Sequence, residues 1–342
     1  MNKYISIFFC VQIIALNLFA MQPKVTPVDY VRPQIDTHKS RWFFFSSASR
    51  PFGMVSLSPD TWTEGSWNSG YLYNSKEIRC FSHVHCWQLA GVPVMPTTGE
   101  VKGHKGMDAY KSTYSHETEI VKPGYHKVEL DTYQIRVELT STSRVGMHRY
   151  TYPAGEKANV LFDVGALLAH GKTEKAAIHR ISSKEIGGYS VLAPTSRRKK
   201  PVTVYFVARF NQNMTAFGGW EKEGKEKKLV HKNSIEGADI GGYASFGKLK
   251  KQTLLMKVGI SYVSEEQARI NLEKELAHWN FDRVKEDAFA EWNRELGKIT
   301  VEGGSEEEKI KFYTDLWHSL LGRHTFSDFN GKYIDNTGEE PV

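Results

Sequence analysis

The chain has 342 residues, 40% of them hydrophobic and 25% charged, with a formal net charge of +6 at pH 7. This composition is typical of a globular protein with one large domain or two ordinary ones. Clusters of basic residues occur separately, at 197–200, 225–228 and 248–251, whereas a nucleic-acid-binding protein gathers its charge on one face. We interpret these clusters as solvated loops and expect no nucleic-acid partner.

The first 20 residues have the features of a secretory signal peptide. Lys3 supplies a positive charge, an apolar run follows it, and Ala20 offers a small residue for cleavage. The apolar run is short for a membrane span, and Cys10 within it lacks the preceding small residues of a lipoprotein signal. We therefore predict a periplasmic or secreted protein, with no membrane attachment once residues 1–20 are removed.

Residues 24–262 are predicted to form a large antiparallel β-sandwich. Short apolar runs between turn residues continue to residue 262. The runs 125–130, 133–140 and 145–153 follow one another closely, so they are predicted to be antiparallel neighbours. Because no gap between runs holds an amphipathic helix, a mainly β fold with two packed sheets accommodates them best.

Three helices are predicted after the sandwich. Ser264 is a suitable N-cap for the first, apolar residues recur at helical spacing over 281–296, and Ser305 with Glu308 has the spacing of a capping box. We assign residues 263–304 to linker helices and 305–342 to the truncated start of a helical domain.

The third predicted helix carries a broad apolar stripe that includes Leu316, Trp317 and Leu320. The residues that follow it form no helix that could cover this stripe. We therefore expect the stripe to be exposed when this chain is made alone.

Two cysteines remain outside the signal peptide, Cys80 and Cys86. The segment 80–86, CFSHVHC, is predicted to be one strand, in which residues six apart lie about 20 Å from each other. A disulfide needs Cα atoms within about 7 Å, so we expect both thiols to be free and buried.

His83 and His85 point to the same face of that predicted strand. Two imidazoles on one face could ligate zinc in an unrelated hydrolase, but no third ligand stands at a recognisable spacing. We favour a polar patch that hydrogen-bonds a ligand or a neighbouring loop, and we predict no metal site. Asp328 and Asn330 are spaced like the start of a calcium loop, but the later acidic ligand is missing, so a turn is expected.

Aromatic side chains are concentrated between residues 52 and 87, among glycines and serines. They are Trp62, Trp67, Tyr71, Tyr73 and Trp87. A sugar ring has an apolar C–H face and a rim of hydroxyl groups, so aromatic platforms with Asn, Asp and His neighbours suit it. The alternative is that these rings belong to the core.

An ordered set of motifs resembles glycoside hydrolase family 92, the calcium-dependent exo-α-mannosidases. The motifs are PFGMVSLSPDT at 51–61, WNSGYLY at 67–73, FSHVHCWQLAGVPVMPTTGE at 81–100, ELTSTSRVGMHRYTYP at 138–153, YFVARF at 205–210 and FYTDLWHSLLGRHTFSDFNGKY at 312–333. The resemblance covers residue 26 to the end. It departs from the family pattern at 33–53 and 86–91, two segments that bear on linkage specificity.

The resemblance implies a β-sandwich, linker helices and an (α/α)6 barrel that is absent or only begun here. It also implies an inverting mechanism with two carboxylates, which the family carries in its helical domain together with most of the calcium shell. No Asp or Glu of this chain matches those carboxylates, so we assign no catalytic residue and no calcium ligand here.

The resemblance also implies that the sandwich forms one wall of the substrate pocket. Trp67 matches a tryptophan beside the sugar ahead of the cleaved bond, and Asp60, His83 and His85 match positions near the domain interface. With Trp62 and Tyr71, these residues form the predicted substrate-binding set.

The expected function is that of the N-terminal domain of an exo-acting α-mannosidase. Its expected partners are α-mannoside glycans and a C-terminal helical catalytic domain. The alternative is a stand-alone carbohydrate-binding or interaction module without catalysis.

Overall fold

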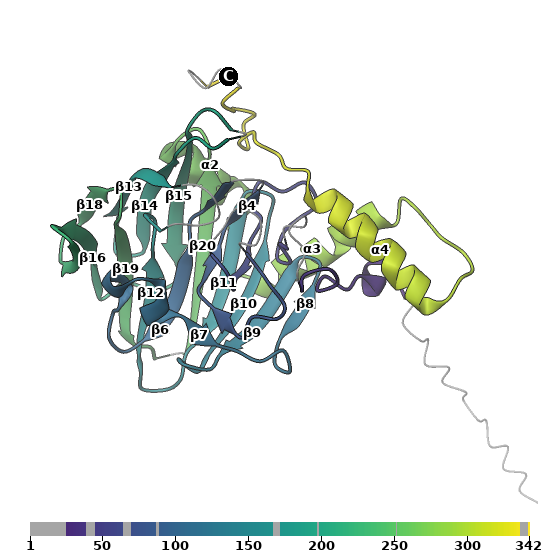
Figure 1. The fold of residues 1–342 in the computed structure, drawn as a ribbon, viewed down its shortest axis with the longest axis horizontal. Helices are drawn as coiled ribbons and strands as arrows, with labels where there is room; N and C mark the ends of the chain where they lie inside the picture. Colours follow the sequence, from purple (N-terminus) through teal and green to yellow (C-terminus); the bar gives the residue numbers. More distant parts are fainter. Residues whose placement is uncertain are drawn as a thin grey trace, which may run out of the picture.

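The computed structural model describes residues 25–38, 45–63, 70–86, 89–166, 172–196, 198–250, 252–335 and 341–342. In these residues the fold is mainly β, as predicted, with two large antiparallel sheets and helices that follow them in sequence (Figure 1). The predicted signal peptide, Trp67 and Trp87 lie outside the described residues.

Two large sheets make up the described part of the sandwich. The first has seven strands in the order β1 (Ser58–Asp60), β3 (Cys80–Ser82), β6 (Val94–Thr98), β12 (Lys157–Phe162), β19 (Gly241–Lys248), β16 (Ala216–Glu223) and β17 (Glu226–Val230). The second has nine, in the order β18 (Ser234–Gly237), β13 (Thr173–Arg180), β14 (Glu185–Leu192), β15 (Val202–Phe210), β20 (Thr253–Ser261), β11 (Val145–Thr151), β10 (Ile135–Ser141), β9 (Tyr125–Leu130) and β8 (Ile120–Lys122).

Smaller elements complete the described fold. They are the strand pairs β2 (Glu77–Ile78) with β7 (Ser112–Thr113) and β4 (Val84–Cys86) with β5 (Leu89–Gly91), the 3-10 turns η1 (Pro27–Tyr30) and η2 (Gly103–Lys105), and the helices α1 (Met107–Tyr110), α2 (Glu265–Glu275), α3 (Phe281–Leu296) and α4 (Glu306–Leu321).

The core lies between the two large sheets. Side chains alternate along β15, so Val204, Phe206 and Phe210 are buried in the core while Tyr205 and Arg209 remain partly exposed. Phe206 stacks on Phe162 of β12, in the opposite sheet, with 5.9 Å between ring centroids. This contact joins the two sheets directly.

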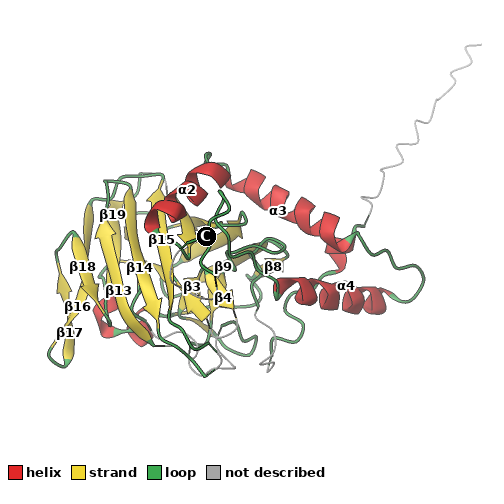
Figure 2. Cartoon of the chain, turned by 90° about the horizontal axis from the view of Figure 1, so that it is seen from above, coloured by secondary structure: helices red, strands yellow, loops and turns green. Residues whose placement is uncertain are grey.

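Helix α2 covers the outer face of the nine-stranded sheet, over β15 and β20 (Figure 2). Leu272 of α2 is buried in one cluster with Val145 and Val207. The backbone of Gly259 lies so close that an added Cβ would be 2.4 Å from the carbonyl oxygen of Ala268. The centre of this sheet is therefore buried on both faces.

The local predictions for the helices are confirmed. Ser264 accepts a hydrogen bond from the Gln267 amide at the start of α2, α3 has the predicted bounds, and Ser305 forms a capping box with Glu308. The strands β9, β10 and β11 are antiparallel neighbours as expected. No helix in the described part of the chain is long and apolar enough to cross a membrane.

The prediction that the apolar stripe of α4 is uncovered was wrong for Trp317. Its side chain is fully buried, with its ring centroid 6.0 Å from that of Trp292 on α3. Val28 and Val31, from the N-terminal end of the described chain, belong to the same cluster. Leu316 and Leu320 pack against this cluster and are partly buried. Segments far apart in sequence thus cover the stripe together.

The prediction that segment 80–86 forms one strand was wrong. The segment divides into β3, which belongs to the seven-stranded sheet, and β4, which pairs with β5. The break falls at His83, whose backbone N–H donates to the Gly91 carbonyl. Cys80 and Cys86 are free and buried, as expected.

Candidate functional site

Asp60 lies at the centre of a buried polar network at the end of β1. Its Oδ1 atom accepts a hydrogen bond from His85 Nε2 at 2.8 Å. Its Oδ2 atom accepts from Ser82 Oγ at 2.5 Å and from Cys80 Sγ at 3.4 Å. Because both oxygens are occupied and the side chain is buried, the carboxylate is held in place rather than presented to a substrate.

His85 donates from both ring nitrogens. Besides the bond to Asp60, its Nδ1 atom donates to the Ser56 carbonyl at 2.6 Å. An imidazole that donates twice carries two protons and a positive charge. Burial alone would lower the pKa of His85, but the charge of Asp60 and the bonds to Asp60 and Ser56 raise it above its usual value. The two side chains form a buried ion pair.

His83 belongs to a second network that runs away from Asp60. Its Nδ1 atom lies 2.7 Å from the Val92 carbonyl, so it donates there, and its Nε2 atom lies 2.8 Å from His148 Nε2. His148 Nδ1 in turn lies 2.8 Å from the hydroxyl of Tyr150. One set of neutral tautomers satisfies the whole row, with Tyr150 donating to His148 and His148 donating to His83.

The charges of these histidines agree with that assignment. Burial lowers the pKa of His83 to about 4 and holds the pKa of His148 well below its usual value. His83 is therefore neutral at neutral pH, whereas His85 is stabilised as a cation. Both rings hydrogen-bond neighbouring loops and side chains, which agrees with the interpretation favoured over a zinc-binding pair.

The Asp60 network lies next to a backbone bridge between Trp62 and Gly70, which stand on either side of Trp67 in the sequence. Trp62 and Gly70 exchange backbone hydrogen bonds of 3.0 and 2.6 Å. A Cβ added to Gly70 would lie 3.7 Å from the ring of His85. Trp67 itself lies outside the described residues, and Gly70 places one end of the bridge against the ring of His85.

Tyr71 lies beside a second buried carboxylate, that of Glu119. Its ring stacks on Phe45 with centroids 4.1 Å apart, and its hydroxyl donates to Glu119 Oε2 at 2.9 Å. Gln34 Nε2 donates to the same oxygen at 2.8 Å, and His116 Nδ1 lies 2.7 Å from it. Tyr71 is almost fully buried, so its hydroxyl group holds the Glu119 carboxylate in place beneath the molecular surface.

Glu119 was not recognised in the sequence, because Gln34 and Tyr71 are far from it in the chain and its spacing from His116 and His126 matches no known motif. Burial would raise its pKa, but His126 and then His116 and Tyr71 lower the pKa below its usual value. His126 Nε2 lies 3.0 Å from Glu119 Oε1. The carboxylate is thus ionised, with Gln34, Tyr71 and His116 around Oε2, while Oε1 faces His126 without hydrogen-bond geometry.

Among the described residues, two rings of the predicted aromatic surface are accessible, those of Trp62 and Tyr73. Trp62 is 39% exposed, with the guanidinium of Arg79 5.6 Å from its ring centroid. Tyr73 is 40% exposed and stacks on His116 at 4.0 Å. Of the predicted set, Asp60 and His85 come together in one network, His83 and Tyr71 lie in separate ones, and Trp62 stands at the surface.

Comparisons with known proteins agree with this architecture. The family description "Glycosyl hydrolase family 92 N-terminal domain" matches residues 30–261, and "Glycosyl hydrolase family 92 catalytic domain" matches residues 267–340. A β-sandwich with these matches places the chain in the class of glycosidases. More narrowly, the chain belongs to glycosyl hydrolase family 92.

Two solved mannosidases and one curated relative illustrate the likeness. A family 92 α-mannosidase from Bacteroides thetaiotaomicron has a TM-score of 0.81, with 28% identity over 93% of this chain and 44% of its own. That enzyme has also been solved with mannoimidazole. An inverting mannosidase from Bacteroides thetaiotaomicron VPI-5482, 24% identical over 92% of this chain and 43% of its own, has the same fold with a TM-score of 0.80.

The curated relative is an uncharacterized secreted glycosidase of Arthroderma benhamiae. It is 23% identical over 330 residues, which are 87% of this chain and 40% of that protein. This chain therefore spans less than half the length of the relatives it matches.

The described residues do not fit the calcium ion of the resembled family. Calcium takes six to eight oxygen ligands. Asp328 accepts hydrogen bonds from Ser261 Oγ and Asn271 Nδ2 and lies in a turn, as expected. The described acidic side chains that converge with a possible nitrogen ligand, Asp36 and Asp315 with His318, do not make an oxygen cage. We derive no step through calcium.

Proposed function

We propose that this chain supplies the sandwich wall of an exo-acting, inverting α-mannosidase. A helical domain supplies the two catalytic carboxylates and the calcium site, and α-mannosides of glycans are the substrates. The observation that carries this proposal is the likeness, at 28% identity over 93% of the chain, to a solved family 92 α-mannosidase. The predicted domain limits, 24–262, 263–304 and 305–342, and export to the periplasm or beyond, belong to the same proposal.

The chemistry of the sandwich supports this division of labour. An inverting glycosidase needs a carboxylic acid and a carboxylate about 6.5–9.5 Å apart, with room for a water molecule. Asp60 is held by three donors and Glu119 is enclosed by four neighbours. Neither is available for proton transfer to a sugar, so both act by supporting the loops above them.

Trp67 is the residue of this chain proposed to touch the sugar. The experiment is to compare wild type with Trp67→Ala in a protein that carries a complete helical domain. We expect kcat/KM for an α-mannoside to fall roughly 10- to 100-fold, as loss of a stacking platform does elsewhere, with the melting temperature unchanged. Trp279→Ala, at a partly exposed tryptophan outside the predicted substrate-binding set, is the matched control.

Product stereochemistry tests the inverting mechanism. Proton NMR during the first turnovers should show β-mannose appearing before the α-anomer. α-Mannose as the first product would contradict the proposed mechanism.

In the Trp67→Ala experiment, equal losses of stability and activity would assign that residue to the core.

The alternative is a stand-alone carbohydrate-binding module, which the exposed rings of Trp62 and Tyr73 also suit. It differs in one measurable respect. A binding module would bind α-mannosides without a helical domain, and Trp62→Ala would weaken that binding.

A further inference from the structure

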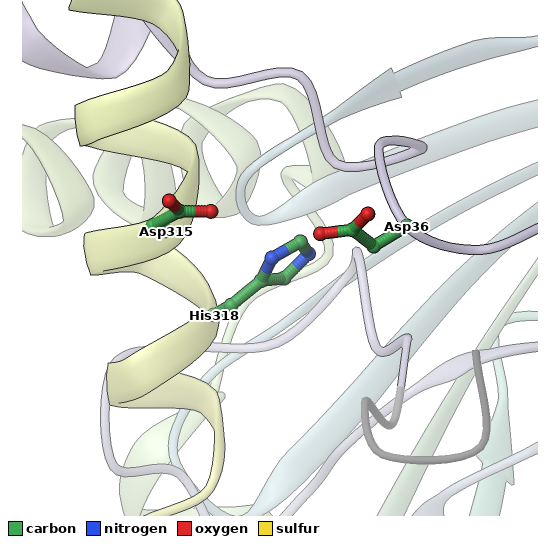
Figure 3. A group of neighbouring side chains, drawn as sticks. All are labelled: Asp36, Asp315 and His318. Carbon is green, nitrogen blue, oxygen red and sulfur yellow. The ribbon is translucent and has the colours of Figure 1, made fainter.

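A group of possible metal ligands lies outside the carbohydrate site, where the N-terminal segment crosses α4. Asp36 follows η1 in the chain, and Asp315 and His318 are three residues apart on α4, so they share one face of the helix. The ligand atoms of all three lie within 4.8 Å of one another. In Figure 3 the ring of His318 lies between the two carboxylates.

The two segments are held together by contacts that do not involve these ligands. The Arg32 amide donates to Thr314 Oγ1 at 3.0 Å. The ring of Tyr30 stacks on that of Tyr313, with centroids 5.6 Å apart. Val31 is buried in the same cluster as Trp317. The site is therefore positioned by packing before any ion binds, which lowers the entropic cost of binding.

His318 is oriented in the way that metal-binding histidines usually are. It is 6% exposed and makes a hydrogen bond to the backbone of Pro33. Proline has no backbone N–H, so the acceptor is the Pro33 carbonyl and the imidazole donates. A neutral ring that donates one N–H to a carbonyl carries its lone pair on the other nitrogen.

The competing cation near the site is Lys311. Its ammonium group lies 2.8 Å from Asp315 Oδ2, and the two side chains are 77% and 47% exposed. An exposed ion pair of this kind is held weakly. A divalent ion that is also bound by His318 and Asp36 would displace it.

We propose that Asp36, Asp315 and His318 bind one divalent transition-metal ion of the zinc type, with water completing its coordination. Imidazole together with carboxylate favours zinc, nickel or cobalt over calcium and magnesium, which prefer oxygen ligands alone. The ion would fasten the N-terminal segment to α4. This site is independent of the proposed mannosidase function.

The test uses the whole chain, stripped of metal with a chelator and titrated with Zn²⁺ by calorimetry. We expect one equivalent to bind, with an increase in melting temperature. Asp36→Asn and Asp315→Asn should each weaken binding by at least about tenfold, since even indirect ligand supports contribute 10- to 100-fold. Asp287→Asn is the matched control, because Asp287 is an exposed helix aspartate with an i,i+4 basic neighbour on α3.

Cobalt gives a second readout. Co²⁺ bound at a nitrogen-containing site of low coordination number should show visible absorption that Zn²⁺ removes and Asp36→Asn abolishes. Asp36 and Asp315 are exposed, so their variants should keep the wild-type circular dichroism. Unchanged Zn²⁺ affinity in both aspartate variants would overturn the proposal. So would Ca²⁺ binding as tightly as Zn²⁺ with the same dependence on these residues.

Discussion

The Nε2 atom of His85 lies 2.8 Å from Oδ1 of Asp60, and neither side chain is more than 5% exposed. The pair joins β4 to the end of β1, and Gly70 lies against the ring of His85. Because the polar atoms of both side chains are already hydrogen-bonded to neighbours, the pair holds these two strands together.

Removing the charge of Asp60 should destabilise the sandwich. Asp60→Asn leaves the imidazolium of His85 buried without its counter-ion, a change that typically costs about 3–5 kcal/mol. Urea unfolding followed by tryptophan fluorescence measures this loss. Asp108→Asn, at a largely exposed carboxylate, is the control and should lie within about 0.5 kcal/mol of wild type. A similarly small effect of Asp60→Asn would show that the pair is not charged.

The stability contributed by His85 should depend on pH in a defined direction. Its pKa in the folded protein is raised above the unfolded value of about 6.5. The folded state thus holds the proton more tightly, so the contribution is complete below about pH 6.5 and is lost as the pH rises through the folded pKa. The difference in unfolding free energy between wild type and His85→Gln should therefore shrink on the alkaline side.

The matched control for this pH series is His278→Gln, at a histidine near the surface between α2 and α3. This variant gives the baseline for removing an imidazole outside the Asp60 network. A His85→Gln difference that grows with increasing pH would show that the neutral ring is the one preferred by the fold.

The cluster around Trp317 leads to a prediction about α4. Trp317→Ala removes a fully buried ring between α3 and the N-terminal segment, which should lower the free energy of unfolding by about 3–5 kcal/mol.

Deleting residues 305–342 should expose Trp292 and Leu296 and cause self-association, visible by light scattering. A soluble, monomeric deletion variant with unchanged stability would contradict this account of the cluster.

Local features of the fold could be predicted from the sequence because they depend on neighbouring residues. The capping box at Ser305, the N-cap at Ser264 and the helical spacing over 281–296 are each decided within a few residues. The order of strands β9 to β11 follows from short turns for the same reason.

Features that depend on distant contacts could not be predicted. Trp317 packs in one cluster with Val28 and Val31, which lie near the other end of the chain. The Arg32 amide donates to Thr314, which is 282 positions away in the sequence. The break in the strand over 80–86 falls at His83, whose backbone N–H donates to Gly91 and whose ring bonds to Val92 and His148, contacts that no local pattern reveals. Glu119 and the Asp36, Asp315 and His318 group have no recognised sequence motif, because tertiary packing brings Gln34 and Tyr71 to Glu119 and brings Asp36 to α4.

The central claim is that this chain supports the mannoside pocket and that a helical domain performs the chemistry. Its most direct test is mannose release from an aryl α-mannoside by the purified 342-residue chain with calcium added, compared with Asp60→Asn. We predict no release above the buffer blank from either protein, because Asp60 is occupied by three donors and is shielded from the substrate. Calcium-dependent release by this chain, abolished by Asp60→Asn, would place the catalytic carboxylate in the sandwich and contradict the account.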